Sequence, residues 1–460
     1  MRRSIVSFVV ITLIATACGT STTTNGPESA EAGQSDGTAP PISEGGLRDP
    51  LDAALEAAGG EQIGGSVSML GVLGGEELDA FDTVLAPFEE ATGITIEYES
   101  SRDIGVLIQT RVDGGNPPDV VSTPTIGQLF DYAEQGVLID LAEVLDVSSV
   151  ERNYDESLMN IVTREGATFG LFNTVNLAGL IWYNPTTYTG PTDPATWSEL
   201  ESWTVETAAG GETPWCIGLE SGAASGWPGA EFITGMLLRQ AGPEFHDQWW
   251  QGEVAWTSPE VKRAFETYGA IATDPKMVYG GPEAVLATNF ENGADGAFMD
   301  PPSCFLHEQA TFMGGIIAGN FPDLEPIESV DFFGIPDFSA EFDDLQQISG
   351  EVVAMFNDTP QARALVNYLA TPEAGALIAQ TGRWLSPNSG VPTDEYTDPF
   401  LARAAEILSS AGGVSYLGSD LLPQTLVEGF WRATLDYVND PAQLDAILER
   451  LEGIRQEAYP

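Results

Sequence analysis

Two hydrophobic periods alternate at the start of the globular part of the chain. Apolar and polar positions alternate over residues 67–72, a period of two that is typical of a strand. Apolar residues then recur at helical spacing, namely Leu78, Phe81, Val84, Leu85 and Phe88. Gly93 follows as a helix-ending glycine, and residues 94–98 (ITIEY) predict a second strand. The order strand, helix, strand predicts a β-α-β unit.

The same order then recurs further along the chain. Residues 104–112 have a helical pattern, residues 119–121 are extended, and residues 127–134 are helical again. Alternation of this kind predicts an α/β fold with a mostly parallel sheet covered by helices. Ligands in such folds gather at the carboxyl ends of the strands, so the segments 74–76 and 122–125 are placed at a candidate cleft.

Further elements are predicted along the rest of the chain. Strands are predicted at residues 169–172, 177–183, 215–219, 296–299, 330–335 and 351–356. Helices are predicted at residues 47–58, 196–208, 230–239, 258–272, 360–370 and 372–381. The C-terminal segment predicts a helix whose apolar face is formed by Leu444, Ile447, Leu448, Leu451 and Ile454.

The N-terminus predicts export. Arg2 and Arg3 precede an apolar run at residues 5–17, which is too short to span a bilayer and matches a secretory signal peptide over residues 1–17. Small residues before Cys18 resemble a bacterial lipobox, which implies a lipid on Cys18. Ala15 stands where that motif usually has Leu, so an ordinary signal peptide is the alternative. Residues 18–46 then predict a flexible tether, rich in Thr, Ser, Gly and Pro.

Cysteine usage agrees with an exported protein. Apart from Cys18, the chain has Cys216 and Cys304, and we expect them to form a disulfide. Two buried free thiols are the alternative. His246 and His307 have no metal-ligand spacing, so no metal site is expected.

The charge balance is strongly acidic. The chain has 17 Lys and Arg against 69 Asp and Glu, a formal net charge of −52. Phosphate backbones would be repelled, so nucleic acid is not expected as a partner. The charged fraction of 19% and the hydrophobic fraction of 43% predict a globular protein with an acidic surface. A salty habitat and a partner with a basic docking surface would each explain that surface.

The usual signatures of catalysis and nucleotide binding are absent from the sequence. Lys262 follows Val and Lys276 follows Pro, so neither completes a phosphate-binding loop. The patterns GxSxG and HExxH do not occur. Paired carboxylates could serve a glycosidase, but with 69 acidic residues such pairs are expected by chance. We therefore expect no catalytic residues and no cofactor.

A stretch of small and aromatic residues at 211–232 (GETPWCIGLESGAASGWPGAEF) favours carbohydrate binding. Small residues let the backbone approach a ligand closely, and an exposed Trp offers a flat apolar face with one donor. Both suit a sugar ring, which has C–H groups on its faces and hydroxyls at its edge. The alternative is a loop whose Trp residues fill a core.

The order of these features resembles the extracellular solute-binding proteins of ATP-binding-cassette importers, particularly the carbohydrate-binding group that includes maltose- and α-glucoside-binding proteins. The resemblance covers nearly all of residues 64–460. It rests on FEEATGITIEY at 88–98, GGNPPDVV at 114–121, YAEQGVLIDL at 132–141, GLFNTVNLAGLIWYNP at 170–185, DPATWSEL at 193–200, TPWCIGLESGAASGWPG at 213–229, FENGADGAFMDPPS at 290–303, NDTPQARALVNYLATPEAG at 357–375 and SDLLPQTLVEGFW at 419–431.

This resemblance implies a two-lobed periplasmic-binding-protein-like type II fold, with a hinge between two α/β lobes. Lobe one would comprise residues 64–172 plus 336–382, and lobe two residues 173–335 plus 383–460. The chain would cross between them near residues 172–174, 335–338 and 382–383. Ligand would bind between the lobes, and an importer permease would recognise the closed form. The expected protein is a monomer, lipid-anchored at the extracellular face of the membrane or in the periplasm.

Candidate ligand-binding residues follow by position within this resemblance. They are Gly75, Glu76, Thr123, Pro124, Glu220, Ser221, Trp227, Asp300, Gly350, Glu351, Arg383, Trp384 and Trp431. Carboxylates such as Glu76, Asp300 and Glu351 would accept hydrogen bonds from sugar hydroxyls, and Arg383 would donate. The tryptophans would stack on sugar rings. The alternatives are solvated or helix-capping carboxylates and tryptophans that pack in the core.

The expected function is therefore capture of an extracellular carbohydrate, an α-glucoside or another oligosaccharide, for an importer. One alternative is the same fold binding another polar solute, such as a polyamine, a glycerophosphate or a peptide. A second alternative is a surface-anchored carbohydrate-active enzyme.

Overall fold

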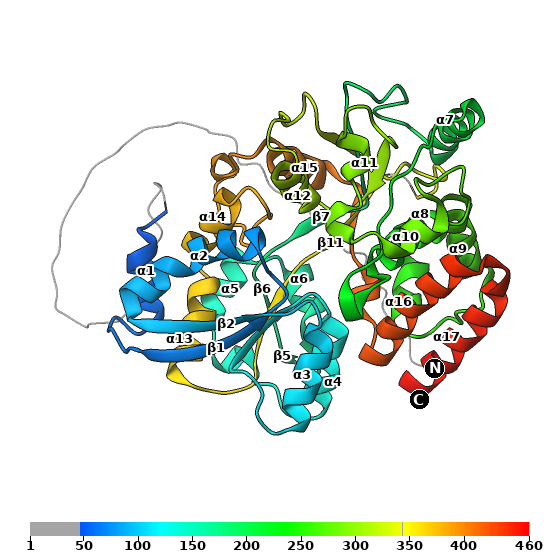
Figure 1. Cartoon of the computed structure of the whole chain (residues 1–460). Helices are drawn as coiled ribbons and strands as arrows, with labels where there is room; N and C mark the ends of the chain where they lie inside the picture. Colours follow the sequence, from blue (N-terminus) through cyan, green and yellow to red (C-terminus); the bar gives the residue numbers. More distant parts are fainter. Residues whose placement is uncertain (1–46, 343, 460) are drawn as a thin grey trace, which may run out of the picture.

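The structure is a computed structural model that describes residues 47–342 and 344–459. The predicted signal peptide, the tether and Cys18 lie outside these residues. The described chain forms two lobes side by side, one containing most of the N-terminal third and the other containing the C-terminal helices (Figure 1). The α/β fold predicted from the sequence is thus present.

A five-stranded sheet forms the centre of the first lobe. Strand β1 (Gly65–Gly71) lies between β2 (Ile94–Ser100) and β3 (Val120–Thr123) and is parallel to both. Strand β12 (Val352–Met355) pairs antiparallel with β3 and with β6 (Leu171–Phe172). The sheet is therefore mixed rather than mostly parallel, because the late strand β12 enters it in the opposite direction.

Helices cover both faces of this sheet. Val67 and Met69 of β1 face the core beneath α2 (Glu76–Thr92) and α13 (Pro360–Leu369), whereas Leu70 faces the core of α3 (Ile104–Asp113) and α4 (Ile126–Glu134). This division follows from the alternation of side chains along a strand. Gly93 ends α2 in the left-handed conformation, with φ of 67°, as the sequence predicts.

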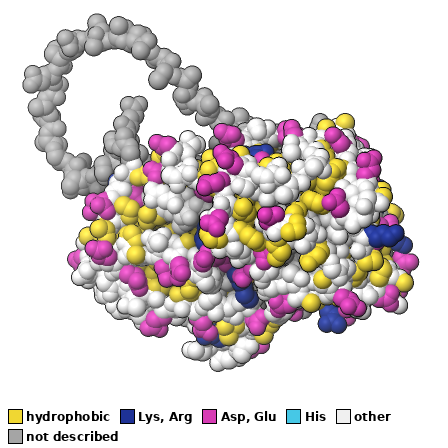
Figure 2. All heavy atoms as spheres, turned by 45° about the horizontal axis from the view of Figure 1, so that its top comes forward, with side chains coloured by type: hydrophobic (Ala, Val, Ile, Leu, Met, Phe, Trp, Pro, Cys, Tyr) yellow, Lys and Arg dark blue, Asp and Glu magenta, His cyan; other side chains and the backbone are white. Residues whose placement is uncertain are grey.

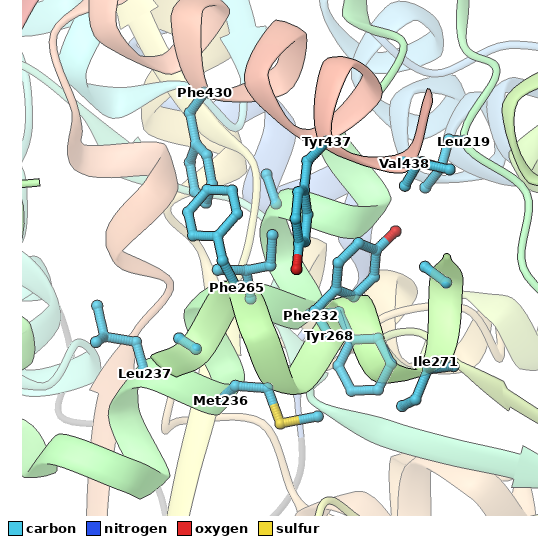
Figure 3. Close-up of a cluster of buried hydrophobic side chains, with 14 of the residues drawn as sticks. Leu219, Phe232, Met236, Leu237, Phe265, Tyr268, Ile271, Phe430, Tyr437 and Val438 are labelled. Carbon is cyan, nitrogen blue, oxygen red and sulfur yellow. The ribbon is translucent and has the colours of Figure 1, made fainter. Parts of the chain in front are cut away.

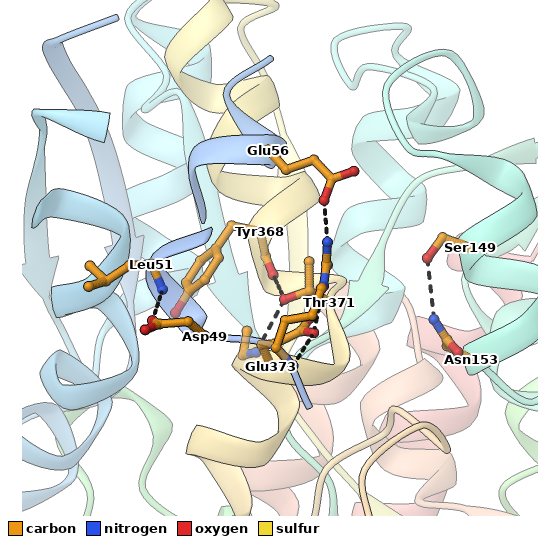
Figure 4. Close-up of polar contacts among 10 residues, drawn as sticks. Asp49, Leu51, Glu56, Ser149, Asn153, Tyr368, Thr371 and Glu373 are labelled. Carbon is orange, nitrogen blue, oxygen red and sulfur yellow. Dashed lines mark hydrogen bonds and ion pairs between the residues drawn. The ribbon is translucent and has the colours of Figure 1, made fainter. Parts of the chain in front are cut away.

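Polar contacts fix the first described helix, α1 (Pro50–Ala57), against this layer (Figure 4). Asp49 caps α1 by accepting a hydrogen bond from the N–H of Leu51, at 2.9 Å. Arg48 donates to Glu373 in α14 (Pro372–Gln380), with 2.9 Å between Nε and Oε1. The start of the described chain is thereby tied to a helix more than 300 residues later.

Four helices build most of the second lobe. They are α8 (Trp227–Trp250), α9 (Pro259–Ala272), α16 (Gln424–Asn439) and α17 (Leu444–Ala458). Their apolar faces meet in an aromatic core in which Phe265 packs against Phe430 and Tyr437, each with ring centroids 5.7 Å apart (Figure 3). The C-terminal helix expected from the 444–454 pattern is α17, and it closes this core.

Two three-stranded sheets complete the core of the molecule. The first has the order β10 (Asp331–Gly334), β8 (Leu180–Tyr183) and β9 (Leu306–Glu308). The second has the order β13 (Gly413–Tyr416), β11 (Leu345–Ser349) and β7 (Asn176–Ala178), and β7 and β11 lie between the lobes in Figure 1.

Gly179 divides the strand predicted at residues 177–183 into β7 and β8, which belong to different sheets. Its φ of 67° lies in the left-handed region, where the chain can turn out of one sheet and into the next. Strand β11 runs antiparallel to β7, and Gly350 and Glu351 join β11 to β12 of the first lobe. The residue bounds given above for the two lobes stay a prediction.

Two predicted strands of the second lobe are not strands. Residues 296–299 were expected to be extended, but α11 (Asp295–Phe298) is a short helix, because a short apolar run does not distinguish a buried helix from a buried strand. Residues 215–219 make only isolated bridges, from Trp215 to Val278 and Leu306. This segment is held by the disulfide between Cys216 and Cys304, whose Cα atoms lie 5.6 Å apart.

The remaining helices and strands are α5 (Val147–Asn153), α6 (Glu156–Ile161), β4 (Thr163–Arg164), β5 (Ala167–Thr168), α7 (Trp197–Gly210), η2 (Gly222–Ala224), α10 (Gly281–Ala287), η3 (Phe290–Asn292), α12 (Met313–Asn320), α15 (Pro399–Ser410) and η5 (Gly418–Leu421), with short 3-10 turns at η1 (Leu141–Glu143), η4 (Thr393–Glu395) and η6 (Pro441–Gln443). Within residues 47–342 and 344–459, no helix is both long enough and apolar enough to cross a membrane.

Candidate functional site

A cavity of about 170 Å³ lies between the lobes and is lined by residues from both. The first lobe contributes the loop after β1, the start of α3, and Gly350 and Glu351 between β11 and β12. The second lobe contributes η2, the first turns of α8 and α16, and η5. The cavity therefore lies where the carboxyl ends of β1 and β3 face the second lobe, as expected for an α/β fold.

The structure brings part of the predicted site together at this cavity. The predicted residues that line it are Pro124, Ser221, Trp227, Gly350, Glu351, Trp384 and Trp431. Those that do not line it are Gly75, Glu76, Thr123, Glu220, Asp300 and Arg383. The ligand-binding roles of all of them stay predictions.

Glu76 and Arg383 lie outside the cavity and contact each other. Their side chains form an ion pair, with 3.0 Å between Nη2 and Oε2. Gly75 directly precedes Glu76 and is the N-cap of α2. Its φ of 55° lies in the left-handed region, which glycine adopts readily.

Glu220 organises a loop instead of facing the cavity. Its carboxylate accepts hydrogen bonds from the N–H of Gly222 at 3.0 Å and from Asn289 Nδ2 at 2.7 Å, and these two bonds lower its pKa. Thr123 is buried and its hydroxyl contacts that of Thr125 at 2.9 Å. Asp300 is exposed at the end of α11.

Aromatic side chains form one wall of the cavity. Trp227 packs edge-on against Phe290, with ring centroids 5.3 Å apart, and lies 6.1 Å from the ring centroid of Phe312. All three rings and Trp431 line the cavity. Trp384 also reaches it, although it is 98% buried and packs in the core of the first lobe. The wall is apolar and carries indole N–H donors, which suits one face of a sugar ring.

Carboxyl groups face the cavity from both lobes. Glu351 is 9% exposed, and its Oε2 has no hydrogen-bond partner among the residues that the structure describes. Burial, followed by the nearby charge of Glu77, raises the pKa of Glu351 to about 8. Glu231 in α8 is 3% exposed and likewise has an oxygen, Oε1, without a partner in the described chain. Burial raises its pKa too.

Asp420 in η5 is a third carboxyl group that lines the cavity. Its pKa is raised well above the usual range by burial and then by the charge of Glu231. An unsatisfied buried carboxyl group is costly, and a hydrogen-bonding ligand would satisfy it. A pKa raised to about 8 favours the protonated form of Glu351 and Glu231 at neutral pH, in which each can donate one hydrogen bond as well as accept.

Arg102 is the one positively charged residue among the described residues that line the cavity. Its Nη2 lies 2.6 Å from Oε2 of Glu77 and 3.0 Å from Oε1 of Glu291, so its charge is already matched by two carboxylates. Within the described part of the chain, the cavity therefore offers no unmatched cation to a phosphate or a carboxylate ligand.

Sequence reasoning did not select several of these residues. Arg102, Glu231 and Asp420 come from the β2–α3 loop, α8 and η5, which meet only in the folded chain. Glu231 stands four residues after Trp227 in the same helix, and that helical spacing is the one signal that could have found it.

The comparisons with known proteins agree with this geometry. A family profile described as bacterial extracellular solute-binding protein matches residues 74–376. The osmoprotective compounds-binding protein GgtB of Synechocystis sp. is 33% identical over 396 residues, which cover 85% of this chain and 93% of that protein. The alpha-glucosides-binding periplasmic protein AglE of Rhizobium meliloti is 33% identical over 395 residues, which cover 83% of this chain and 85% of that protein.

Solved structures share the fold at lower sequence identity. A chitin oligosaccharide binding protein has a TM-score of 0.73 and 19% identity, and the match covers 86% of this chain and 98% of that one. The binding protein RafE in complex with raffinose has a TM-score of 0.67 and 17% identity, with 86% and 100% covered. These likenesses confirm the two-lobed solute-binding-protein fold.

Proposed function

Because the chain belongs to the family of bacterial extracellular solute-binding proteins, we propose that its ligand is an uncharged carbohydrate, an α-glucoside or another small oligosaccharide. The ligand binds in the cavity between the lobes and is delivered to the permease of an ATP-binding-cassette importer.

The observation that carries this proposal is the pairing of an aromatic wall with unpartnered buried carboxyl groups. Trp227, Phe290 and Trp431 offer an apolar surface to one face of a ring. Glu351 and Glu231 offer carboxyl oxygens that lack partners within the described residues. A sugar ring supplies both complements, C–H groups for the wall and hydroxyls that donate and accept at its edge.

The charges in the cavity argue against anionic ligands. A glycerophosphate or the carboxylate of a peptide would need an unmatched cation, and Arg102 is held by Glu77 and Glu291. A polyamine would instead need ionised carboxylates, but burial raises the pKa of Glu351 and Glu231 to about 8, which favours their neutral form. An uncharged polyhydroxyl ligand fits both conditions.

The names of the two relatives point the same way. AglE is named for binding alpha-glucosides and GgtB for binding osmoprotective compounds, and each is 33% identical to this chain over most of its length. An uncharged glucoside is a class of compound that fits both names.

We propose that the protein binds without turnover, as a monomer, at the extracellular face of the membrane. Closure of the lobes around ligand requires contacts from both lobes at once, and the cavity provides them. The lipid on Cys18 would hold the protein near its permease, with residues 19–46 as a tether.

Thermal unfolding against a panel of solutes tests this function. Ligand at about a hundred times its dissociation constant adds about 2.7 kcal/mol to the free energy of unfolding, which raises the melting temperature by a few degrees. We expect trehalose, sucrose or maltose to raise it, and spermidine and glycerol 3-phosphate to leave it unchanged. A rise with spermidine or glycerol 3-phosphate alone would refute the carbohydrate. Release of free glucose from any of the sugars would refute binding without turnover.

A further inference from the structure

We propose that Arg102 and Asp103 of the first lobe form, with Ala223 and Glu291 of the second lobe, a clasp across one mouth of the cavity that limits the ligand to about one or two sugar rings. This inference rests on the proposed function and adds the size of the ligand to it. We call these four residues the clasp.

The clasp lies where the cavity meets solvent. Arg102, Asp103 and Ala223 all line the cavity, and Asp103 and Ala223 are exposed. Residues that are exposed and also line a cavity mark its mouth. A ligand longer than the cavity would have to pass between them.

Asp103 makes the first bridge between the lobes. Its Oδ1 accepts a hydrogen bond from the N–H of Ala223 at 2.8 Å. The two backbones approach closely at this point, because a Cβ added to Gly222 would lie 2.9 Å from the same oxygen. Gly222 also has φ of 58°, so both its conformation and its lack of a side chain permit the contact.

Arg102 makes the second bridge. One guanidinium nitrogen contacts Glu77 of the first lobe and Glu291 of the second, at 2.6 and 3.0 Å. The guanidinium carbon also lies 5.2 Å from the centroid of the Phe290 ring. Because Phe290 packs against Trp227, this bridge is continuous with the aromatic wall.

The second-lobe side of the clasp is a braced platform. Glu220 accepts from the N–H of Gly222 and from Asn289, which joins the two segments that carry Ala223 and Glu291. The backbone of Glu220 also exchanges hydrogen bonds with Thr288 and Phe290, at 3.0 Å each. The two segments therefore move as one unit, and the role of Glu220 is to position the clasp.

The approach beside the clasp is narrowed by a further contact between the lobes. Gln424, at the start of α16, donates its N–H to Asp131 Oδ2 in α4 at 3.0 Å. A Cβ added to Gly105, in the first turn of α3, would lie 2.7 Å from the side-chain nitrogen Nε2 of Gln424. The second lobe therefore contacts the segment at the start of α3 in two places, at Arg102 and Asp103 and at Gly105.

The volume of the cavity fits a short ligand. At about 10–15 Å³ for each water molecule, about 170 Å³ holds about 11–17 waters. A hexose has about 12 non-hydrogen atoms, so this volume corresponds to about one sugar ring and, at most, part of a second. A longer chain can bind only if the clasp opens.

Calorimetric titration with α-glucosides of increasing length tests the clasp. The probes are trehalose, sucrose, maltose, maltotriose and maltotetraose. The variants are Arg102→Ala and Glu291→Gln, and Arg432→Ala is the charge-matched control, because Arg432 is exposed and pairs with Asp436 outside the cavity. The melting temperature of each variant shows whether it is folded.

We expect the wild-type protein to bind its best disaccharide at least about tenfold more tightly than maltotetraose, a difference of about 1.4 kcal/mol. Arg102→Ala should reduce that ratio to about threefold or less, Glu291→Gln should reduce it partly, and Arg432→Ala should leave it unchanged.

Equal affinity of the wild-type protein for maltose and maltotetraose would overturn the clasp while leaving the carbohydrate function in place. An equal loss of affinity for saccharides of every length in Arg102→Ala would also overturn the clasp. Arg102 would then contribute to the affinity for ligand without selecting its length. If no saccharide of any length binds, the proposed function fails, and the clasp inference fails with it.

Discussion

Arg383 Nη2 lies 3.0 Å from Glu76 Oε2, so these two residues, which were both expected to bind ligand, form an ion pair with each other. Glu76 is 65% exposed in its side chain, and neither residue lines the cavity. The Arg383 side chain is only 16% exposed, so the pair is partly buried. The two charges match each other outside the cavity, and the ligand-binding roles of both residues stay predictions.

The first prediction contrasts Glu76 with Glu351. Glu76→Gln should change the affinity for the best disaccharide by less than about threefold, because Glu76 lies outside the cavity. Glu351→Gln should weaken it by about tenfold or more, since Glu351 faces the cavity with an unpartnered oxygen. Calorimetric titration measures both constants. A larger loss in Glu76→Gln than in Glu351→Gln would contradict this assignment.

The second prediction concerns the pH dependence of stability. The pKa of Glu351 rises from 4.5 to about 8 on folding, so the unfolded chain releases this proton at lower pH than the folded chain does. The free energy of unfolding should therefore fall as pH rises from about 5 to about 8, by on the order of a few kcal/mol from this group.

Glu351→Gln removes the titrating carboxyl group, so the difference in stability between the wild-type protein and the variant at each pH isolates the contribution of Glu351. Urea unfolding of both proteins at pH 5, 6.5 and 8 should show the variant gaining stability relative to the wild-type protein as pH rises. Parallel pH profiles of the two proteins would show that Glu351 has an ordinary pKa in the folded state.

The third prediction concerns the disulfide. Cys216 and Cys304 close a loop of 88 residues, which stabilises the folded state by about 4.5 kcal/mol through the entropy of the unfolded chain. The double variant Cys216→Ser, Cys304→Ser should lower the melting temperature by several degrees. Reductant should lower the melting temperature of the wild-type protein only. The same effect of reductant on the double variant would mean that the disulfide is not its target.

The fourth prediction concerns salt. With 17 basic residues against 69 acidic ones, most carboxylates cannot have a basic partner. Asp and Glu side chains are spread over the visible face, whereas Lys and Arg occupy a few places (Figure 2). Unpaired carboxylates repel one another, and salt screens this repulsion. The melting temperature should therefore rise by several degrees between about 0.05 and 1 M NaCl at pH 7.

The salt effect should shrink at pH 4, where many carboxylates are protonated. An equal effect at both pH values would contradict screening and would point to a general effect of salt on burial of apolar surface.

The sequence located many of the local elements and the tryptophans of the aromatic wall. The period of the apolar residues located α2 and α17, the Ser-Pro start signal located α9, and the Gly-Trp-Pro-Gly turn singled out Trp227, which is the first residue of α8. These predictions rest on neighbours in the chain, so local patterns carry them.

The polar part of the site could not be predicted in the same way. Arg102 and Glu291 are separated by 189 residues and belong to different lobes, so only the tertiary structure brings them together. Glu76 and Arg383 are separated by 307 residues, and their mutual contact outside the cavity has no signal in the local sequence. Which carboxylates are buried and which are paired depends on tertiary contacts of this range.

Calorimetric titration of trehalose, sucrose and maltose in phosphate and in Tris distinguishes an uncharged ligand from a cation, because the two buffers have different heats of protonation. We expect saturable binding of at least one of these sugars with the same heat in both buffers, because an uncharged ligand does not change the protonation of Glu351 and Glu231. We also expect at least a tenfold weaker affinity, about 1.4 kcal/mol, in Trp227→Ala than in the wild-type protein, while Trp203→Phe, outside the cavity, binds normally. Binding of spermidine alone, with a heat that differs between the buffers because protons are released, would contradict carbohydrate binding.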